Sequence, residues 1–128
     1  MAAIDIPGQE PPKVPLSMGT TAGGFVFVSG QVASRPDGTF FVGDFEKEVE
    51  MTLDNVEAVL TQGGAQWTDV VKVQVYLSSA QLFSRFNEVY AARLGSHRPA
   101  RTALIVGFAH PDVRVEVDAI AWTGKDAA

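Results

Sequence analysis

The chain has 128 residues, with 15 acidic and 10 basic side chains and no cysteine. This length is typical of one domain that buries its own core. Without cysteine the chain has no disulfide, no thiolate metal site and no cysteine nucleophile. The net charge of −5 and the scattered basic residues argue against nucleic acid or an anionic membrane as the main partner. No apolar run approaches the ~20 residues of a membrane span, and the first residues lack the pattern of a signal peptide, so the expected location is the cytoplasm.

Three segments are predicted along the chain. Residues 1–14 are rich in proline and show no periodicity, which predicts an irregular N-terminal arm. Residues 15–124 are predicted to form a single domain, and residues 125–128 are predicted to form a C-terminal tail. The sequence contains no internal repeat and no stretch typical of an interdomain linker.

Five strands and two amphipathic helices are predicted in this domain. The strands cover residues 25–28, 39–42, 70–77, 100–106 and 113–122. The first helix follows an Asp44 cap and stops at Gly63. The second helix follows a capping box over Ser78–Gln81 and stops at Gly95. Each helix has one apolar stripe, so both are expected to pack on a sheet in a two-layer α+β domain.

The last predicted strand has a mixed outer face. Arg114, Glu116 and Asp118 alternate with apolar residues, but the same face continues with Ile120 and Trp122. Such a face is either solvated or covered by a partner subunit. In a chain of this size, a cleft for a ligand forms more easily between subunits than within one.

Arg101 lies at the start of an apolar strand, where a buried charge without a partner would be costly. Two roles fit this position equally well from the residues alone. Glu116 or Asp118 could form an internal salt bridge with Arg101. Alternatively, the guanidinium could bind a substrate carboxylate through two parallel hydrogen bonds.

The other candidate residues also have two interpretations. Glu116 is either part of a solvated sheet face, which the residues alone favour, or a half-buried carboxylate that activates water. Gly30 follows Ser29 at the end of a strand, and it is either part of a small-residue turn or a place where a ligand approaches the backbone. His97 and His110 lie in predicted loops without the spacing of metal ligands, so surface or loop-ordering roles are expected and no metal site is predicted.

Two stretches of sequence are specific in combination. Arg98-Pro99-Ala100-Arg101-Thr102 is followed at a suitable distance by Val115-Glu116-Val117-Asp118-Ala119-Ile120-Ala121. Further matches of lower specificity lie within residues 25–31, 53–56, 69–77 and 83–90. In this order, over about residues 15–122, the chain resembles the RidA (YjgF) family of small trimeric imine and enamine deaminases.

The resemblance implies a two-layer, chorismate-mutase-like α+β fold, with a mixed sheet, two helices on one face, and ligand clefts at the subunit interfaces of a homotrimer. It assigns Arg101 to the carboxylate of the substrate and Glu116 to the attacking water. It implies that the substrate pocket involves Leu16, Ser29, Gly30, Phe83, Asn87 and Ala103, with Asn87 supporting the cleft. The expected reaction hydrolyses a small 2-imino or enamine carboxylic acid to a 2-keto acid and ammonia, with neither a metal nor an organic cofactor.

The chain departs from the pattern of the family at Leu16, at Ala103, and in the loop between Tyr90 and Arg101, which is about three residues shorter, with Pro111 one place off. Leu16 stands where a tyrosine often closes the pocket, so the substrate is expected to differ from the usual small imino acids. Ala103 replaces a cysteine that is frequent in the family. Little loss of activity is expected, because the resemblance implies that the backbone of this residue, and not its side chain, takes part in the chemistry. Two other functions stay open: a non-catalytic trimer that binds a small carboxylate, and ribonuclease activity, against which the acidic charge and the lack of a histidine pair argue.

Overall fold

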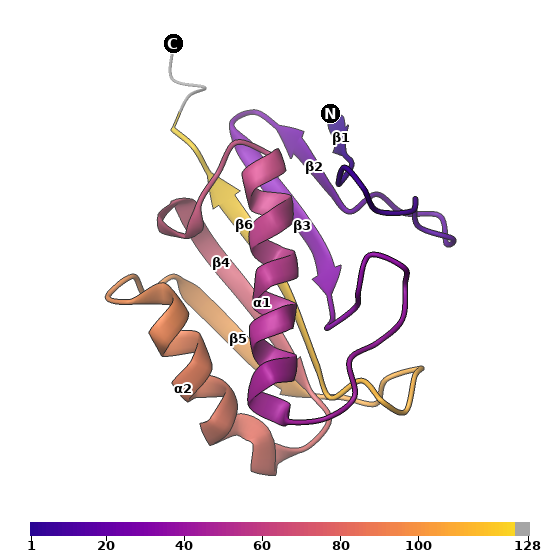
Figure 1. Ribbon diagram of the computed structural model, residues 1–128. Helices are drawn as coiled ribbons and strands as arrows, with labels where there is room; N and C mark the ends of the chain where they lie inside the picture. The colour runs from indigo at the N-terminus through magenta and orange to yellow at the C-terminus, as the bar shows by residue number, and fades with distance from the viewer. Residues whose placement is uncertain (125–128) are drawn as a thin grey trace.

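The computed structural model describes residues 1–124, and the predicted C-terminal tail, residues 125–128, lies outside the described residues (Figure 1). Within residues 1–124 the chain forms six strands and two long helices. In chain order these are β1 (Ala2–Ile4), β2 (Gly19–Ala22), β3 (Phe25–Gln31), α1 (Phe45–Gln62), β4 (Val70–Leu77), α2 (Phe83–Leu94), β5 (Ala100–Ile105) and β6 (Val115–Trp122). Short 3-10 helices, η1 (Trp67–Asp69) and η2 (Ala80–Leu82), precede β4 and α2.

The strands form one mixed sheet in the order β1-β2-β3-β6-β4-β5. Strands β4 and β5 run parallel and are joined through α2, whereas all other neighbours run antiparallel. Both helices lie on the same face of the sheet (Figure 1). This arrangement confirms the predicted two-layer α+β domain. It also leaves the opposite face of the sheet uncovered in the single chain and places β5 at an edge.

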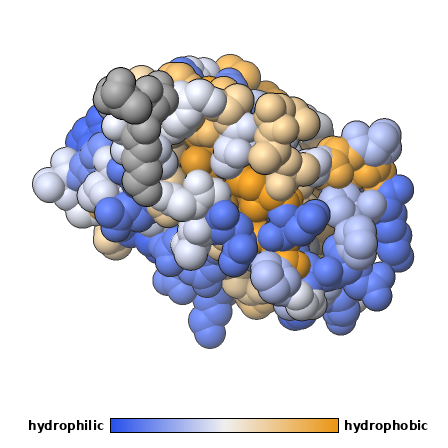
Figure 2. All heavy atoms as spheres, turned by 90° about the horizontal axis from the view of Figure 1, so that it is seen from above, coloured by the Kyte–Doolittle hydropathy of each residue, from blue (hydrophilic) through white to orange (hydrophobic). Residues whose placement is uncertain are grey.

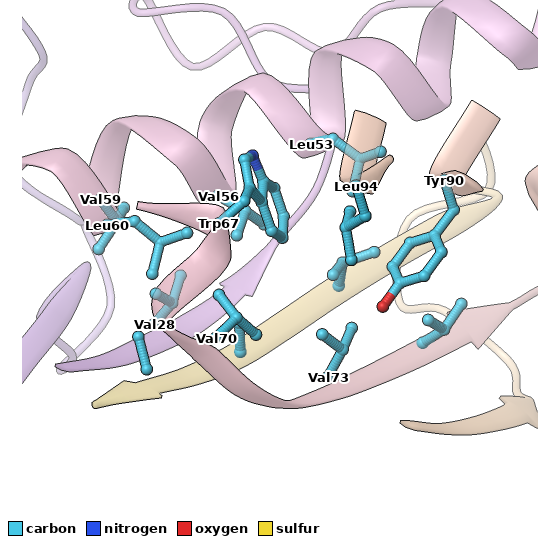
Figure 3. Packing of buried hydrophobic residues seen from close by; sticks show 14 of the residues in the cluster. Val28, Leu53, Val56, Val59, Leu60, Trp67, Val70, Val73, Tyr90 and Leu94 are labelled. Atoms are coloured by element: carbon cyan, nitrogen blue, oxygen red, sulfur yellow. The ribbon is translucent and has the colours of Figure 1, made fainter. Parts of the chain in front are cut away.

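The core lies between the helices and the sheet. Leu53, Val56 and Leu60 of α1 face Val70 and Val73 of β4 (Figure 3). These five side chains are almost completely buried, and burial of each contributes about 1.5–3 kcal/mol. The apolar stripe predicted for α1 therefore holds this helix on the sheet. Neither helix of the described residues is long and apolar enough to cross a membrane.

The helix ends largely follow the signals in the sequence. The Asp44 side chain accepts a hydrogen bond from the backbone N–H of Lys47 (3.2 Å) at the start of α1. Gly95 ends α2 with a φ of 62°, in the left-handed region that favours glycine. The predicted capping box is wrong, because Ser79 rather than Ser78 forms the cap. Ser79 caps the short η2 helix.

Two strands near the N-terminus differ from the sequence-based expectation. Ala2–Ile4, within the predicted irregular arm, pairs antiparallel with Gly19–Ala22. Both strands are too short to show an alternating pattern, so tertiary pairing rather than local sequence defines them. The strand predicted over residues 39–42 is absent from the described structure, where Phe40 makes one isolated bridge to Ser34.

A buried ion pair fixes the start of β6 against α1. Glu48 of α1 is 2% exposed. Its carboxylate accepts hydrogen bonds from the backbone N–H (2.9 Å) and the Nε (2.7 Å) of Arg114. Arg114 also donates from Nη2 to the carbonyl oxygen of Gly43. The Arg114 side chain therefore packs toward the helix layer, although the sequence placed it on the mixed outer face of the last strand.

The open face of the sheet carries apolar side chains. Phe25 pairs in register with Trp122, and Phe27 pairs with Ile120, across β3 and β6. The side chains of Phe25, Phe27 and Trp122 are about two-fifths exposed (39%, 38% and 41%). Figure 2 views the molecule from above rather than onto the open face, and on that side apolar surface (orange) is exposed between hydrophilic areas (blue). A group of exposed apolar side chains on one face is typical of an interaction surface.

Candidate functional site

Arg101 lies on the face of the sheet that the helices cover. It pairs in register with Val73 of β4, whose side chain belongs to the core. The guanidinium carbon lies 5.0 Å from the ring centroid of Tyr90, and 5.7 and 5.8 Å from those of Phe83 and Phe86. At these distances the faces of aromatic rings attract a cation. Aromatic side chains of α2 therefore hold the cationic end of Arg101.

Among residues 1–124, no carboxylate forms an ion pair with Arg101. Glu116 lies on the open face of the sheet, because it pairs with Tyr76, which is offset by an odd number of residues from Val73. Asp118, two residues further along β6, lies on the same open face. The structure therefore excludes the internal salt bridges considered above. The guanidinium has no internal anion in the described chain.

A cavity of about 290 Å³ adjoins Arg101 at the edge of the sheet. It is lined by Asn87, Tyr90, Ala91, Arg98, Pro99 and Arg101, from α2 and from the segment that enters β5. Its size is at the lower end of the range for small-molecule sites. This cavity is called the arginine pocket below.

Two buried polar atoms of residues that line the arginine pocket lack hydrogen-bond partners within residues 1–124. They are the Oδ1 of Asn87 and the hydroxyl of Tyr90, and Tyr90 is only 6% exposed. Burial raises the pKa of the Tyr90 hydroxyl, while the charges of Arg101 and Arg98 oppose that shift. Most buried polar groups in proteins are hydrogen-bonded, so two unpaired ones beside a free guanidinium indicate a place for a polar ligand.

Glu116 belongs to a second group of polar residues, on the open face. It lies against the backbone of Gly30, where a Cβ atom would collide with the Glu116 carboxylate. Tyr76 lies opposite Glu116 in the register and donates a hydrogen bond from its hydroxyl to Oδ2 of Asp118 (3.1 Å). On the same face, Lys72 donates from Nζ to the hydroxyl of Thr102 (2.9 Å).

The carboxylates of this second group hold their protons more tightly than usual. Burial raises the pKa of Glu116, and the negative charge of Asp118 raises it further. Burial also raises the pKa of Asp118, against the opposing effects of the Tyr76 hydrogen bond and the Lys72 charge. A half-buried carboxylate with a raised pKa is a candidate for proton transfer.

The structure gives a definite reason for glycine at position 30. The pairing of β3 with β6 shifts register between Val28 and Gln31, and this irregularity brings the Gly30 backbone against Glu116. Next to it, the hydroxyl of Ser29 donates to the carbonyl oxygen of Ser17 (2.6 Å). That bond ties the segment after Leu16, which is half exposed, to the end of β3.

The candidate residues thus fall into two groups within one chain. Arg101 and Asn87 line the arginine pocket, and Phe83 packs against the guanidinium of Arg101. Ala103 follows on the same face of β5, packed against the core. Glu116, Gly30 and Ser29 lie together at the irregular end of β3, on the open face. Arg101 and Glu116 therefore lie on opposite faces of the sheet in one chain.

Sequence reasoning missed several members of these groups. The sequence indicates only that Tyr90 belongs to the apolar stripe of a helix, and its ring does pack in the core. Nothing in the sequence shows that its hydroxyl would be unpaired. In the sequence, Arg98 is part of a motif and Tyr76 is part of a predicted strand, with no further signal. Their roles depend on neighbours from distant parts of the chain.

The two histidines have structural roles. The Nε2 of His97 lies 2.8 Å from the carbonyl oxygen of Val70, which connects the loop after α2 to the start of β4. The His110 ring packs edge-on against Phe40, with centroids 4.5 Å apart. Within residues 1–124, no group of three or more histidine, aspartate or glutamate side chains is placed to hold a metal ion.

Comparison with known proteins identifies the family. The family model described as Endoribonuclease L-PSP matches residues 8–123. The chain belongs to this family, also called RidA or YjgF. A RutC family protein of Pyrococcus abyssi is 38% identical to the chain over 112 residues, which cover 87% of this chain and 88% of the relative. The mitochondrial protein MMF1 of Saccharomyces cerevisiae is 32% identical over 111 residues, which cover 87% of this chain and 77% of the relative.

Solved structures of RidA family members have the same fold. Yeast Mmf1 superimposes with a TM-score of 0.88 at 30% identity, covering 94% of this chain and 97% of that one. The YjgF gene product of E. coli superimposes with a TM-score of 0.86 at 28% identity, covering 95% of this chain and 98% of that one. E. coli TdcF, solved with bound serine, gives the same values for score, identity and coverage. These matches confirm the fold that the sequence resemblance predicted.

Proposed function

We propose that this RidA family member hydrolyses a small 2-imino or enamine carboxylic acid to the 2-keto acid and ammonia. The observation that supports this most is the state of Arg101. Its guanidinium is held by aromatic rings, has no internal carboxylate, and lies beside the unpaired polar atoms of Asn87 and Tyr90. A carboxylate ligand would supply the missing anion through two parallel hydrogen bonds. The bound serine in the TdcF structure shows that a related protein binds a small carboxylate.

The active site in this proposal lies between subunits of a homotrimer. Arg101 and Glu116 occupy opposite faces of one sheet, so they can meet only if the arginine pocket of one subunit adjoins the open face of the next. The exposed Phe25, Phe27 and Trp122 of the open face give such an assembly an apolar contact surface. A head-to-tail contact of this kind closes into a ring when the rotation between subunits is suitable.

The reaction follows from the two groups of residues. Arg101 binds the substrate carboxylate and orients the adjacent C=N bond. An enamine first gains a proton on carbon and loses one from nitrogen to give the imine. Glu116 of the neighbouring subunit accepts a proton from water while the water oxygen bonds to the imine carbon, and this proton passes to the imine nitrogen. The resulting carbinolamine then loses its C–N bond and its hydroxyl proton, which releases ammonia and leaves the 2-keto acid.

The direct test generates an imino acid in place with an amino-acid oxidase and follows formation of the 2-keto acid. The wild-type protein should accelerate this step above the spontaneous rate, and Arg101→Ala should reduce kcat/KM by about 100-fold, as expected for loss of a charged, bidentate contact. Arg35→Ala, in an exposed turn, is the matched control. Acceleration that survives in Arg101→Ala would contradict the mechanism, and tight binding of a 2-keto acid without any turnover would indicate the non-catalytic alternative.

Ribonuclease activity is the second candidate, because the matching family model carries the description Endoribonuclease. The net charge of −5 argues against a phosphate-binding surface. His97 and His110 are each engaged in separate local contacts. RNA cleavage that copurifies with the protein and disappears in a Glu116→Gln variant would support this candidate over the deaminase.

A further inference from the structure

A second arginine, Arg98, lines the arginine pocket together with Arg101. The turn at Gly95 and the His97 contact to β4 fix the short loop that carries Arg98. Arg98 donates from Nη1 to the carbonyl oxygens of His97 (2.9 Å) and Gly95. These bonds hold one nitrogen of the guanidinium in place, and its other N–H groups have no partner among residues 1–124.

The arginine pocket thus has two cations and no internal anion. The ion pairs of the described residues involve Arg85, Arg93, Arg114 and His110, but neither Arg98 nor Arg101. Both guanidinium groups are near enough to Tyr90 for their charges to lower the pKa of its hydroxyl. In a chain whose net charge is −5, a pocket with two unneutralised guanidinium groups is a local exception. One carboxylate would neutralise only one of them.

We infer that the arginine pocket binds a ligand with two carboxylates, so that the substrate is a small 2-imino dicarboxylic acid. Arg101 binds the carboxylate next to the imine, and Arg98 binds the carboxylate at the end of the side chain. This inference rests on the proposed function and specifies its substrate.

Calorimetry with stable keto acids tests the inference without turnover. The probes are 2-oxoglutarate, with two carboxylates, and 2-oxobutyrate, with one. The wild-type protein should bind 2-oxoglutarate at least about tenfold more tightly, and Arg98→Gln should lose most of that preference. Arg101→Gln should weaken the binding of both ligands. Equal wild-type affinities, or equal weakening of both ligands by Arg98→Gln, would overturn the inference.

Two further variants keep the test decisive. Arg93→Gln removes a cation of α2 that pairs with Asp54 outside the pocket, so the ratio of the two affinities should not change. If Arg98→Gln does not fold, Arg98→Lys retains the charge but loses the planar fork, and it should retain only part of the preference. A Gln variant with the full preference would contradict a role for Arg98. A Lys variant with the full preference would contradict a contact that needs the planar guanidinium.

Kinetics separate this inference from the proposed function. Imino acids generated from glutamate and from 2-aminobutyrate are compared in the same assay. If the protein turns over both imino acids at the same rate, and Arg98→Gln does not change these rates, the dicarboxylate specificity is refuted. The proposed deaminase activity would then still hold. Selective binding of 2-oxoglutarate that depends on Arg98, with no turnover of either imino acid, would refute the deaminase and support a dicarboxylate-binding protein.

Discussion

Arg101 and Glu116 project from opposite faces of the same six-stranded sheet. Arg101 pairs with the buried Val73 and is held by rings of α2, whereas Glu116 pairs with Tyr76 and lies against Gly30 on the open face. The two residues that the family resemblance assigns to one reaction therefore belong to two different surfaces of the chain. This relationship is the basis for placing the proposed site between subunits.

Gly30 should be essential for the position of Glu116. A Cβ atom at residue 30 would meet the Glu116 carboxylate, including its Cδ at 2.9 Å, and would push it away. Because a displacement of about 1 Å can cost on the order of 100-fold in rate, Gly30→Ala should lower kcat by at least about tenfold. Gly107→Ala, with open space around its Cβ position, is the control. Wild-type kcat in Gly30→Ala would show that Glu116 needs no fixed position.

Asp118 should set the pH range in which Glu116 acts. Burial and the charge of Asp118 raise the pKa of Glu116, so activity that needs ionised Glu116 is lost, as pH falls, at a higher pH than for an ordinary glutamate. Asp118→Asn removes the charge but can still accept the Tyr76 hydrogen bond. The acidic limb of the kcat/KM profile should therefore move to lower pH.

The matched control for this profile is Asp5→Asn, an exposed aspartate of the N-terminal segment. Its pH profile should superimpose on that of the wild type. If Asp118→Asn leaves the acidic limb in place or moves it to higher pH, another group determines that limb.

Glu48 should contribute strongly to stability. It is buried and accepts two hydrogen bonds from Arg114, whose side chain is 34% exposed, so Glu48→Gln removes the buried anion of this pair. Hydrogen bonds to charged groups contribute about 1.5–3 kcal/mol, and urea unfolding should show a decrease of this order. Glu46→Gln, which breaks the exposed pair with Arg85, should have a much smaller effect. Equal effects of the two substitutions would contradict the burial argument.

Much of the fold could be predicted from the sequence because its signals are local. The stripe of α1, the Asp44 cap and the stop at Gly95 each depend on residues within a few positions of one another. The two N-terminal strands were missed, since short segments such as Ala2–Ile4 become strands only by pairing with a neighbour. The prediction of a strand over residues 39–42 is wrong because, in the described part of the chain, this segment pairs with no neighbouring strand and makes only the isolated β-bridge from Phe40 to Ser34.

The candidate site could be predicted only in part. The motif around Arg101 and the alternation around Glu116 mark the residues, but alternation alone does not show that they face opposite sides of the finished sheet. The unpaired Tyr90 hydroxyl and the approach of Gly30 to Glu116 depend on packing between distant segments. Such contacts follow from the three-dimensional arrangement and leave no local pattern.

Mixed oligomers test most directly whether Arg101 of one subunit works with Glu116 of the next. Arg101→Ala and Glu116→Gln chains are each expected to be inactive alone. If they are mixed at equal amounts by refolding or coexpression, about three quarters of the trimers contain both chains, and each of these has one intact site in three. The mixture should then recover about a quarter of the wild-type activity. Activity no higher than that of the separate variants, in trimers shown to contain both chains, would contradict a shared site.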